Sequence, residues 1–372
     1  MLDEPGQFRA CRAGPHCVRI CSVILIQTDF QSVHLHHFED PIVKHKNTLL
    51  AFIALSAATL VSTASAQEPI VLQTGAFAPP GTVFLEFWQK FKTNVERDSG
   101  ATIKVDLNTS DPNEGNLLSN LRRGRIACAG VSLQGSSTIL PEVGVLQLPY
   151  LFSNFKQVDY AYDKGLTETY RKLFSAKGVE LLQFVEVGFT HTYGVQPIKT
   201  PADVKGVKLR ATQARASQAW IKSTGAEPVV LPIAETMPGL QTGLIKGGEA
   251  GLVIYSAMIA KAAAHYTLTG HAFDSGAILC NKEWFDKLNA KQKSAVQNGW
   301  NTSEQAAATR AGNEQFLTTA ASKGLSIYRP SPAEILQWQA AGKKASEEIL
   351  SGLGADAKKI YDDLAKDIAA AK

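Results

Sequence analysis

The chain has 372 residues, with 38 Lys or Arg against 34 Asp or Glu and a formal net charge of +4 at pH 7. A chain of this length can bury a large core and commonly divides into two lobes. Its charges are spread along the sequence rather than gathered in one stretch, which argues against a nucleic-acid-binding surface.

The N-terminal part of the chain has the features of an export signal. Lys44 and Lys46 form a short basic region, residues 48–61 are almost continuously apolar or small, and Ala64-Ser65-Ala66 has the pattern of a cleavage site. The apolar run is too short to span a bilayer, which takes about 20 helical residues. Gln67 follows where a lipoprotein would need a cysteine. We therefore expect residues 43–66 to be a cleaved signal peptide and the product to be free in the periplasm.

Residues 1–42 do not fit such a leader, because acidic residues and histidines would precede its basic region. A start at the Val43 codon would give a normal leader, so we expect residues 1–42 to be a gene-start artefact or a discarded extension. The segment also holds a set of candidate zinc ligands, but its Cys-x5-Cys-x3-Cys spacing matches no common structural site, and no metal is expected there. These candidates are Cys11, Cys17, Cys21, His34, His36 and His37.

Beyond residue 66, predicted strands and helices alternate, which is the pattern of an α/β protein with largely parallel sheets. Apolar side chains recur at helical spacing in residues 83–97. Thr200-Pro201 begins a short capped turn, with proline at its first helical position. Strands are expected at 70–75, 103–107, 126–132, 180–185, 190–195, 207–211, 228–231 and 275–279. Helices are expected at 83–97, 114–123, 155–176, 214–223, 235–241, 256–261, 290–323, 333–350 and 357–371.

This part of the sequence shows no low-complexity linker. Two lobes would then be joined by strands that cross between them, which makes a hinge rather than a tether. The clefts of binding proteins close around a ligand by such hinge motion.

Only two cysteines follow the leader, Cys128 and Cys280, each in an apolar, strand-like run. We expect two buried free thiols. A single disulfide is the alternative in an oxidising compartment, and the sequence does not decide between the two states.

The most informative stretch runs from Asp203 to Gly251. Its first part, DVKGVKLRA (203–211), reads as a turn and then a strand that carries Arg210 out of an apolar run into a polar loop. Its second part, ETMPGLQTGLIKGGEAG (235–251), reads as a helix that passes through Thr242-Gly243 into an apolar strand. Together they resemble the most recognisable segment of the solute-binding proteins of TRAP transporters, the DctP family. The resemblance extends more loosely over residues 68–372.

The resemblance implies a two-lobed periplasmic binding protein fold, with lobe I at 67–189 and 276–318 and lobe II at 190–275 and 319–372. It also implies that Arg210 binds a substrate carboxylate in the cleft. A guanidinium suits this role because its planar fork of donors matches a carboxylate with two parallel hydrogen bonds. The alternative for Arg210 is an exposed arginine at a strand end.

The chain departs from the family pattern at two positions. Family members commonly carry a second arginine where this chain has Thr190, and the adjacent His191 is either a replacement donor or a solvated histidine. They also commonly carry Asp-Gly-x-Glu-Asn where this chain has Lys246-Gly247-Gly248-Glu249-Ala250, so a ligand-binding amide is missing. These departures argue against a C4-dicarboxylate or a sialic-acid-like sugar acid. They suit a ligand with a less polar body beyond its carboxylate.

Other candidates for ligand contact lie in loops that follow strands, where open α/β sheets bind ligands. Glu249 and His271 resemble family positions near the cleft, with a structural role as the equal alternative. Trp220 is expected to pack in the core. The loop candidates are Phe77, Ser132, Gln134, Gln213 and Ile233.

Signals for catalysis are sparse. The sequence lacks G-x-G-x-x-G after a strand, G-x-x-x-x-G-K-[ST], H-E-x-x-H and G-x-S-x-G. Only His191, His265 and His271 follow the leader, so options for acid–base or metal chemistry are few. We expect no enzyme activity, no cofactor and no metal.

The favoured hypothesis is a monomeric periplasmic receptor that captures a small organic acid and hands it to the membrane subunits of a TRAP-type permease. One alternative is the receptor of an ATP-driven transporter, and another is a ligand-binding partner of a membrane sensor. A secreted α/β hydrolase would need a nucleophile or metal constellation that the sequence does not show.

Overall fold

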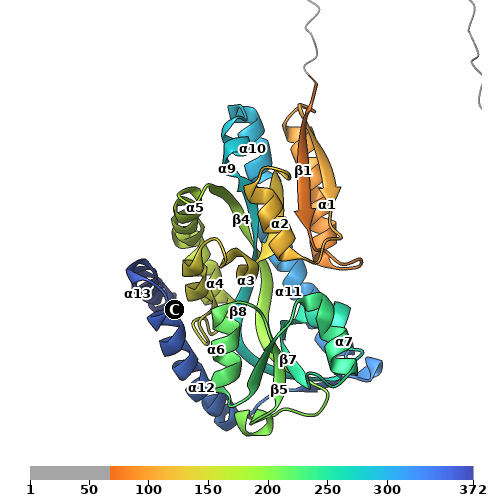
Figure 1. The fold of residues 1–372 in the computed structure, drawn as a ribbon, viewed down its shortest axis with the longest axis vertical. Coiled ribbons are helices and arrows are strands. Elements are labelled where there is room, and N and C mark those ends of the chain that lie inside the picture. The colour runs from red at the N-terminus through yellow and green to blue at the C-terminus, as the bar shows by residue number, and fades with distance from the viewer. Residues whose placement is uncertain (1–67, 372) are drawn as a thin grey trace, which may run out of the picture. The chain divides into compact units, whose positions relative to one another are not determined.

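A nine-stranded mixed sheet organises residues 68–371, the part of the chain that the computed structural model describes (Figure 1). The strand order is β2-β1-β3-β8-β4-β7-β5-β6, and β9 pairs with β8. The predicted signal peptide, the N-terminal extension and the Cys–His group lie outside the described residues. The strands are β1 (Ile70–Ala76), β2 (Ile103–Asn108), β3 (Cys128–Ser132), β4 (Val179–Gly194), β5 (Lys208–Ala211), β6 (Glu227–Val230), β7 (Gly247–Gly251), β8 (His265–Asn281) and β9 (Ser326–Tyr328).

Two long antiparallel strands, β4 and β8, form the middle of this sheet. Strand β3 pairs with one half of β8, from Cys280 to Gly276, whereas β7 pairs with the opposite half of β4, from Thr190 to Gly194. Strands β1–β3 therefore lie along one half of the central pair and β5–β7 along the other. Strands shared in this way supply the crossing connections that the sequence predicts for a hinge.

The length of the central strands differs from the prediction of separate short strands at 180–185, 190–195 and 275–279. Three register shifts interrupt the β4–β8 pairing, at Leu181/Gln183, Glu186/Gly188 and Thr190/Thr192. Gly188 also adopts a φ of 103°, a conformation that favours glycine. Such bulges break the alternation of buried and exposed side chains. The alternating pattern in the sequence therefore ends at a bulge, although the strand itself continues.

Helices cover the two groups of outer strands. Helices α1 and α2 pack beside β1–β3, α6 packs beside β5 and β6, and α12 packs against α6 (Figure 1). The helices are α1 (Val83–Asp98), α2 (Glu114–Arg122), α3 (Leu133–Ser136), α4 (Phe155–Ala161), α5 (Thr167–Ser175), α6 (Arg215–Ser223), α7 (Thr236–Gln241), α8 (Leu252–Ile254), α9 (Lys282–Asp286), α10 (Ala290–Asn298), α11 (Thr302–Thr319), α12 (Pro332–Ser351) and α13 (Ala355–Ala370). The predicted α/β class is confirmed.

Local signals predict several helices well. The apolar stripe of α1 is buried at Phe84, Phe87, Trp88, Phe91 and Val95. The turn at Pro201–Val204 carries the expected capping box between Thr200 and Asp203.

The two longest predicted helices are each divided. Residues 155–176 form α4 and α5, separated by a π-helical turn in which Gly165 has a φ of 103°. Residues 290–323 form α10, α11 and a final 3-10 turn, because the chain leaves the helix at Gly299 and Asn301 then caps α11. The predicted helix at 256–261 is a π-helical turn, Tyr255–Ile259, that follows α8.

Cys128 and Cys280 form a disulfide that joins β3 to β8, so the expected free thiols are a wrong prediction. The two residues face each other in the antiparallel register of these strands, with their Cα atoms 4.0 Å apart. The strands are 152 residues apart in the sequence, and their pairing is not visible in it. The bond fits an exported protein, whose compartment lets disulfides persist.

Candidate ligand-binding site

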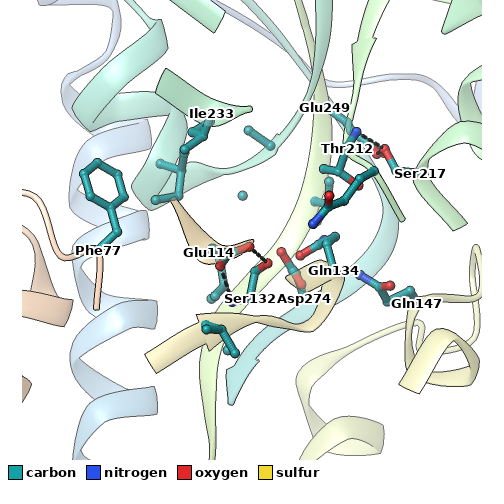
Figure 2. A pocket seen from close by; sticks show the side chains of 18 of the residues that line it. Phe77, Glu114, Ser132, Gln134, Gln147, Thr212, Ser217, Ile233, Glu249 and Asp274 are labelled. Carbon is teal, nitrogen blue, oxygen red and sulfur yellow. Dashed lines mark hydrogen bonds between the residues drawn. The ribbon is translucent and has the colours of Figure 1, made fainter. Parts of the chain in front are cut away.

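A cavity of about 660 Å³, here called the cleft cavity, lies between the two groups of outer strands. Its wall combines the ends of β1 and β3 with β5 and β7, and both central strands contribute side chains. Figure 2 shows side chains from these elements converging on it. A cavity shared by both halves of the sheet is the arrangement in which hinge closure can enclose a ligand.

All but one of the residues predicted to contact ligand line the cleft cavity. The exception is His191. The lining residues among the candidates are Phe77, Ser132, Gln134, Thr190, Arg210, Gln213, Ile233, Glu249 and His271.

Arg210 brings a cation to the wall of the cleft cavity. Strand β5 holds it between the buried residues Leu209 and Ala211, and its own exposed fraction is 8%. Its Nε donates to the carbonyl of Leu231 at 3.1 Å. Within residues 68–371, Arg210 forms no ion pair, and no residue accepts a hydrogen bond from its terminal nitrogens. A buried guanidinium with open donors is suited to a carboxylate from outside the chain.

Glu249 and His271 are bonded to each other at the wall. Glu249 Oε2 lies 2.8 Å from His271 Nε2, and His271 Nδ1 lies 2.8 Å from the Thr269 hydroxyl. In the tautomer with its hydrogen on Nε2, His271 donates to the carboxylate and accepts from Thr269, so both ring nitrogens are satisfied. The Ser217 hydroxyl donates to the other Glu249 oxygen, and the ring of Trp220 stacks on His271 at 4.1 Å.

This network ties β7, β8 and α6 together. Trp220 is 2% exposed, as expected for core packing, although it also lines the cleft cavity. The network supports a positioning role for Glu249 and His271.

A second carboxylate, Glu114, is held on the opposite side of the cleft cavity. Its oxygens accept from the backbone N–H of Ser132 and from the Ser132 hydroxyl, at 2.5 and 2.8 Å (Figure 2). The same hydroxyl accepts from the Gly135 N–H. A Cβ at Gly135 would lie 2.6 Å from Glu114 Oε2, so the absence of a side chain there makes room for this carboxylate. The sequence gives no signal that Glu114 reaches the site.

Asp274 is the other acidic residue that the sequence analysis misses. It lies on β8, and its Oδ1 is buried without a hydrogen-bond partner in the described chain. Burial, followed by the charges of Glu249 and Glu114, raises the pKa of its carboxyl group to about 7, although a hydrogen bond with the Gln134 side chain acts in the opposite direction. An acid inside the apolar run AFDSGAIL is the one sequence signal that points to it.

His191 is the predicted contact residue that does not line the cleft cavity, and its ring is engaged by the chain itself. Its neighbour Thr190 is the one that lines the cavity. His191 Nδ1 accepts from the Gly270 N–H at 2.8 Å, and its ring packs against Tyr266. Burial lowers its pKa to about 3, so the ring is neutral.

The described residues contain no group of three or more His, Cys, Asp or Glu placed to hold a metal ion. No helix among them is long and apolar enough to cross a membrane.

Comparison with known proteins assigns the chain to a family. The pattern that defines the bacterial extracellular solute-binding proteins, family 7 (DctP), matches residues 74–352. The chain belongs to this family. It is therefore a solute-binding protein rather than an enzyme, and the proteins of the family are periplasmic.

Two relatives illustrate the similarity. The C4-dicarboxylate-binding periplasmic protein DctP of Rhodobacter capsulatus is 24% identical over 315 residues, which cover 83% of this chain and 94% of the relative. The 2,3-diketo-L-gulonate-binding periplasmic protein YiaO of Escherichia coli is 28% identical over 213 residues, which cover 56% of this chain and 65% of the relative.

The fold is shared with solved structures. The sugar acid binding protein DctPAm from Advenella mimigardefordensis, in complex with galactonate, superposes with a TM-score of 0.76 at 24% identity, over 82% of this chain and 99% of that one. At this identity the structural similarity shows that the chain has the two-lobed fold. It does not show that the chain binds the same ligand.

The two departures from the family pattern both lie at the cleft cavity. Thr190 and Ala250 are lining residues, and Thr190 pairs with Gly251 while His191 pairs with Ala250. In place of the arginine and the amide that the resemblance leads us to expect, the wall carries a small hydroxyl and a methyl group at these positions. This leaves Arg210 as the cationic side chain among the described lining residues.

Proposed function

We propose that this protein is a periplasmic receptor that captures a small organic acid by its carboxylate and delivers it to the membrane subunits of a TRAP-type permease. The observation that carries the proposal is Arg210, buried in the wall of the cleft cavity with its terminal donors open to an external acceptor. Relatives named for binding C4-dicarboxylates or diketogulonate, and a structural neighbour with bound glucuronate, support an acid as the ligand.

Within this proposal the ligand carboxylate lies at Arg210. The polar part of the wall is formed by Thr190, Ser132, Gln134 and Gln213. Phe77 and Ile233 supply apolar contacts. Glu249 and His271 hold the wall in place. The proposal keeps lobe I at 67–189 and 276–318 and lobe II at 190–275 and 319–372, with a signal peptide at 43–66. The protein acts as a monomer.

A thermal-shift screen tests the proposal directly. Organic acids that bind the folded protein are expected to stabilise it by about 2.7 kcal/mol when present at a hundredfold excess over their dissociation constant. The matched control for each hit is its carboxamide, which keeps the shape but removes the charge that Arg210 recognises. Carboxamides that stabilise the protein as well as the acids would contradict a carboxylate-binding receptor.

Mass spectrometry of the protein secreted by its own host is expected to find Gln67 as the first residue. This follows from the small-x-small pattern Ala64-Ser65-Ala66 that precedes it. An N-terminus upstream of Val43 would show that both the predicted gene start and the signal peptide are wrong.

A further inference from the structure

The charges that line the cleft cavity are mostly negative. Among its described lining residues, Arg210 is the one cationic side chain, whereas Glu114, Glu235, Glu249 and Asp274 are acidic. Two of these acids are engaged by the chain itself: Glu114 by Ser132, and Glu249 by His271 and Ser217. Asp274 interacts with the Gln134 side chain and with the backbone N–H of Ser275, but its Oδ1 has no partner, and no cation or imidazole pairs with it among residues 68–371.

Hydrogen-bond acceptors at the same wall are also unmet. Asp274 Oδ1 and Gln147 Oε1 are both buried, and no described residue donates to either atom. Gln147 is only 7% exposed, and both residues line the cleft cavity. A buried acceptor without a donor costs free energy, and a donor from a ligand recovers it when the side chain turns this oxygen toward the cleft cavity.

The cation and this acid come from different strands of the sheet. Arg210 is on β5 beside β7, whereas Asp274 is on the part of β8 next to the pairing with β3. Figure 2 shows Asp274 close to Gln134 and on the same side as Ser132 and Glu114. A ligand that fills the cleft cavity can therefore meet a guanidinium from β5 and an acid from β8.

We infer that the ligand is a monocarboxylate that also carries a protonated nitrogen, with its carboxylate at Arg210 and its N–H groups at Asp274 and Gln147. This inference rests on the proposed function, and it replaces the expectation of a less polar body beyond the carboxylate, because the buried Asp274 calls for a polar group on the ligand. A second carboxylate in place of the nitrogen would lie beside Asp274 with no cation to balance it. A hydroxyl would supply donors but leave the carboxylate of Asp274 without a counter-charge.

The dependence of affinity on pH follows from the groups around Asp274. Burial and the charges of Glu249 on β7 and Glu114 on α2 raise its pKa to about 7, and Tyr162 also lies within electrostatic range. A cationic ligand needs the ionised carboxylate, so below this pKa binding must first remove a proton. The affinity is expected to fall roughly tenfold between about pH 8 and about pH 6. A dicarboxylate would show the opposite trend.

The test is a calorimetric and thermal-shift screen of the full mature protein against carboxylic acids in three matched sets, with an amino, a hydroxyl or a second carboxylate group at the same position. The amino acids are expected to bind at least about tenfold more tightly than their hydroxy and dicarboxylic counterparts at about pH 8. Asp274→Asn is expected to abolish this preference and the pH dependence. Asp106→Asn, the same change at an exposed position of strand β2, is expected to alter neither.

The outcomes of this screen distinguish a failure of the inferred ligand class from a failure of the proposed receptor function. If the hydroxy or dicarboxylic acids bind as tightly as the amino acids at both pH values, or if Asp274→Asn keeps the preference, the inferred ligand class is wrong while the receptor for acids stands. If no acid in any set binds, the proposed function fails and this inference falls with it. Circular dichroism of both variants shows whether each is folded.

Discussion

Replacing Arg210 by alanine is expected to weaken ligand binding by about 2–5 kcal/mol, which is roughly a 30-fold to several-thousand-fold loss of affinity. The loss is large because the ligand's carboxylate would stay in a closed, water-poor cavity without the donors that replace its hydration. Calorimetry with an acid identified by the thermal-shift screen measures the effect. The affinity of the Arg210→Lys variant is expected to fall between those of the unchanged protein and of Arg210→Ala, because lysine keeps the charge but cannot form two parallel hydrogen bonds.

Lys208→Ala is the matched control for Arg210. Lys208 is on the same strand, β5, but its side chain is exposed and lies outside the cleft cavity. Its removal is expected to leave the affinity unchanged. The Arg210 variants lose the bond to Leu231, so their melting temperatures are measured without ligand to separate folding from binding. An Arg210→Ala protein that is folded and binds the acid with unchanged affinity would refute the proposed carboxylate contact.

The sequence predicts those parts of the fold that depend on near neighbours. The stripe of α1 and the capping box at Thr200 and Asp203 each involve residues within a few positions of one another. Strand β4 was harder to predict because its bulges, at Glu186/Gly188 among others, reverse the alternation on which the prediction depends. The disulfide between Cys128 and Cys280 depends on a strand pairing across 152 residues, which no local pattern encodes.

The same difference between local and distant interactions explains which residues of the candidate site the sequence predicts. Arg210 was recognisable because its surrounding motif is contiguous, and the loops after strands bring Phe77, Ser132 and Gln134 to the cleft cavity as expected. His191 contacts Gly270 and Tyr266 on β8 instead of lining the cavity, and the sequence does not show which strand lies beside it. The pKa of Asp274 is raised by burial and by the charges of Glu249 and Glu114, which lie on other elements, so this effect exists only in the folded chain.

Arg310 is the other residue whose loss is expected to have a large effect, in this case on folding. It lies on α11 and bridges two acids from other elements. Its guanidinium donates to both oxygens of Glu186 on β4, at 2.9 and 2.7 Å, and to Asp159 on α4 at 2.9 Å. Glu186 is 8% exposed and lies at one of the register shifts of the central strands. The ion pair therefore connects two helices to the crossing strands of the predicted hinge.

Arg310→Ala is expected to lower the free energy of unfolding by about 3–5 kcal/mol at pH 8, measured by urea denaturation. The reason is that Glu186 would remain buried without its cation. Burial already raises the pKa of Glu186, and Arg310 opposes that rise. Without the arginine the pKa rises further, so the native protein holds a proton that the unfolded chain releases. Stability then falls as the pH increases through the raised pKa, and the deficit of the variant is expected to shrink toward pH 5.

A second substitution separates this explanation from a loss of packing. Glu186→Gln removes the stranded charge, so adding it to Arg310→Ala is expected to restore part of the lost stability at pH 8 and to remove the pH dependence of the deficit. Arg97→Ala, which removes an exposed arginine paired with Asp98, serves as the control and is expected to change the unfolding midpoint little. If the double variant is no more stable than Arg310→Ala at pH 8, the arginine stabilises the fold through its contact with the Phe155 ring, 4.3 Å away, rather than by neutralising Glu186.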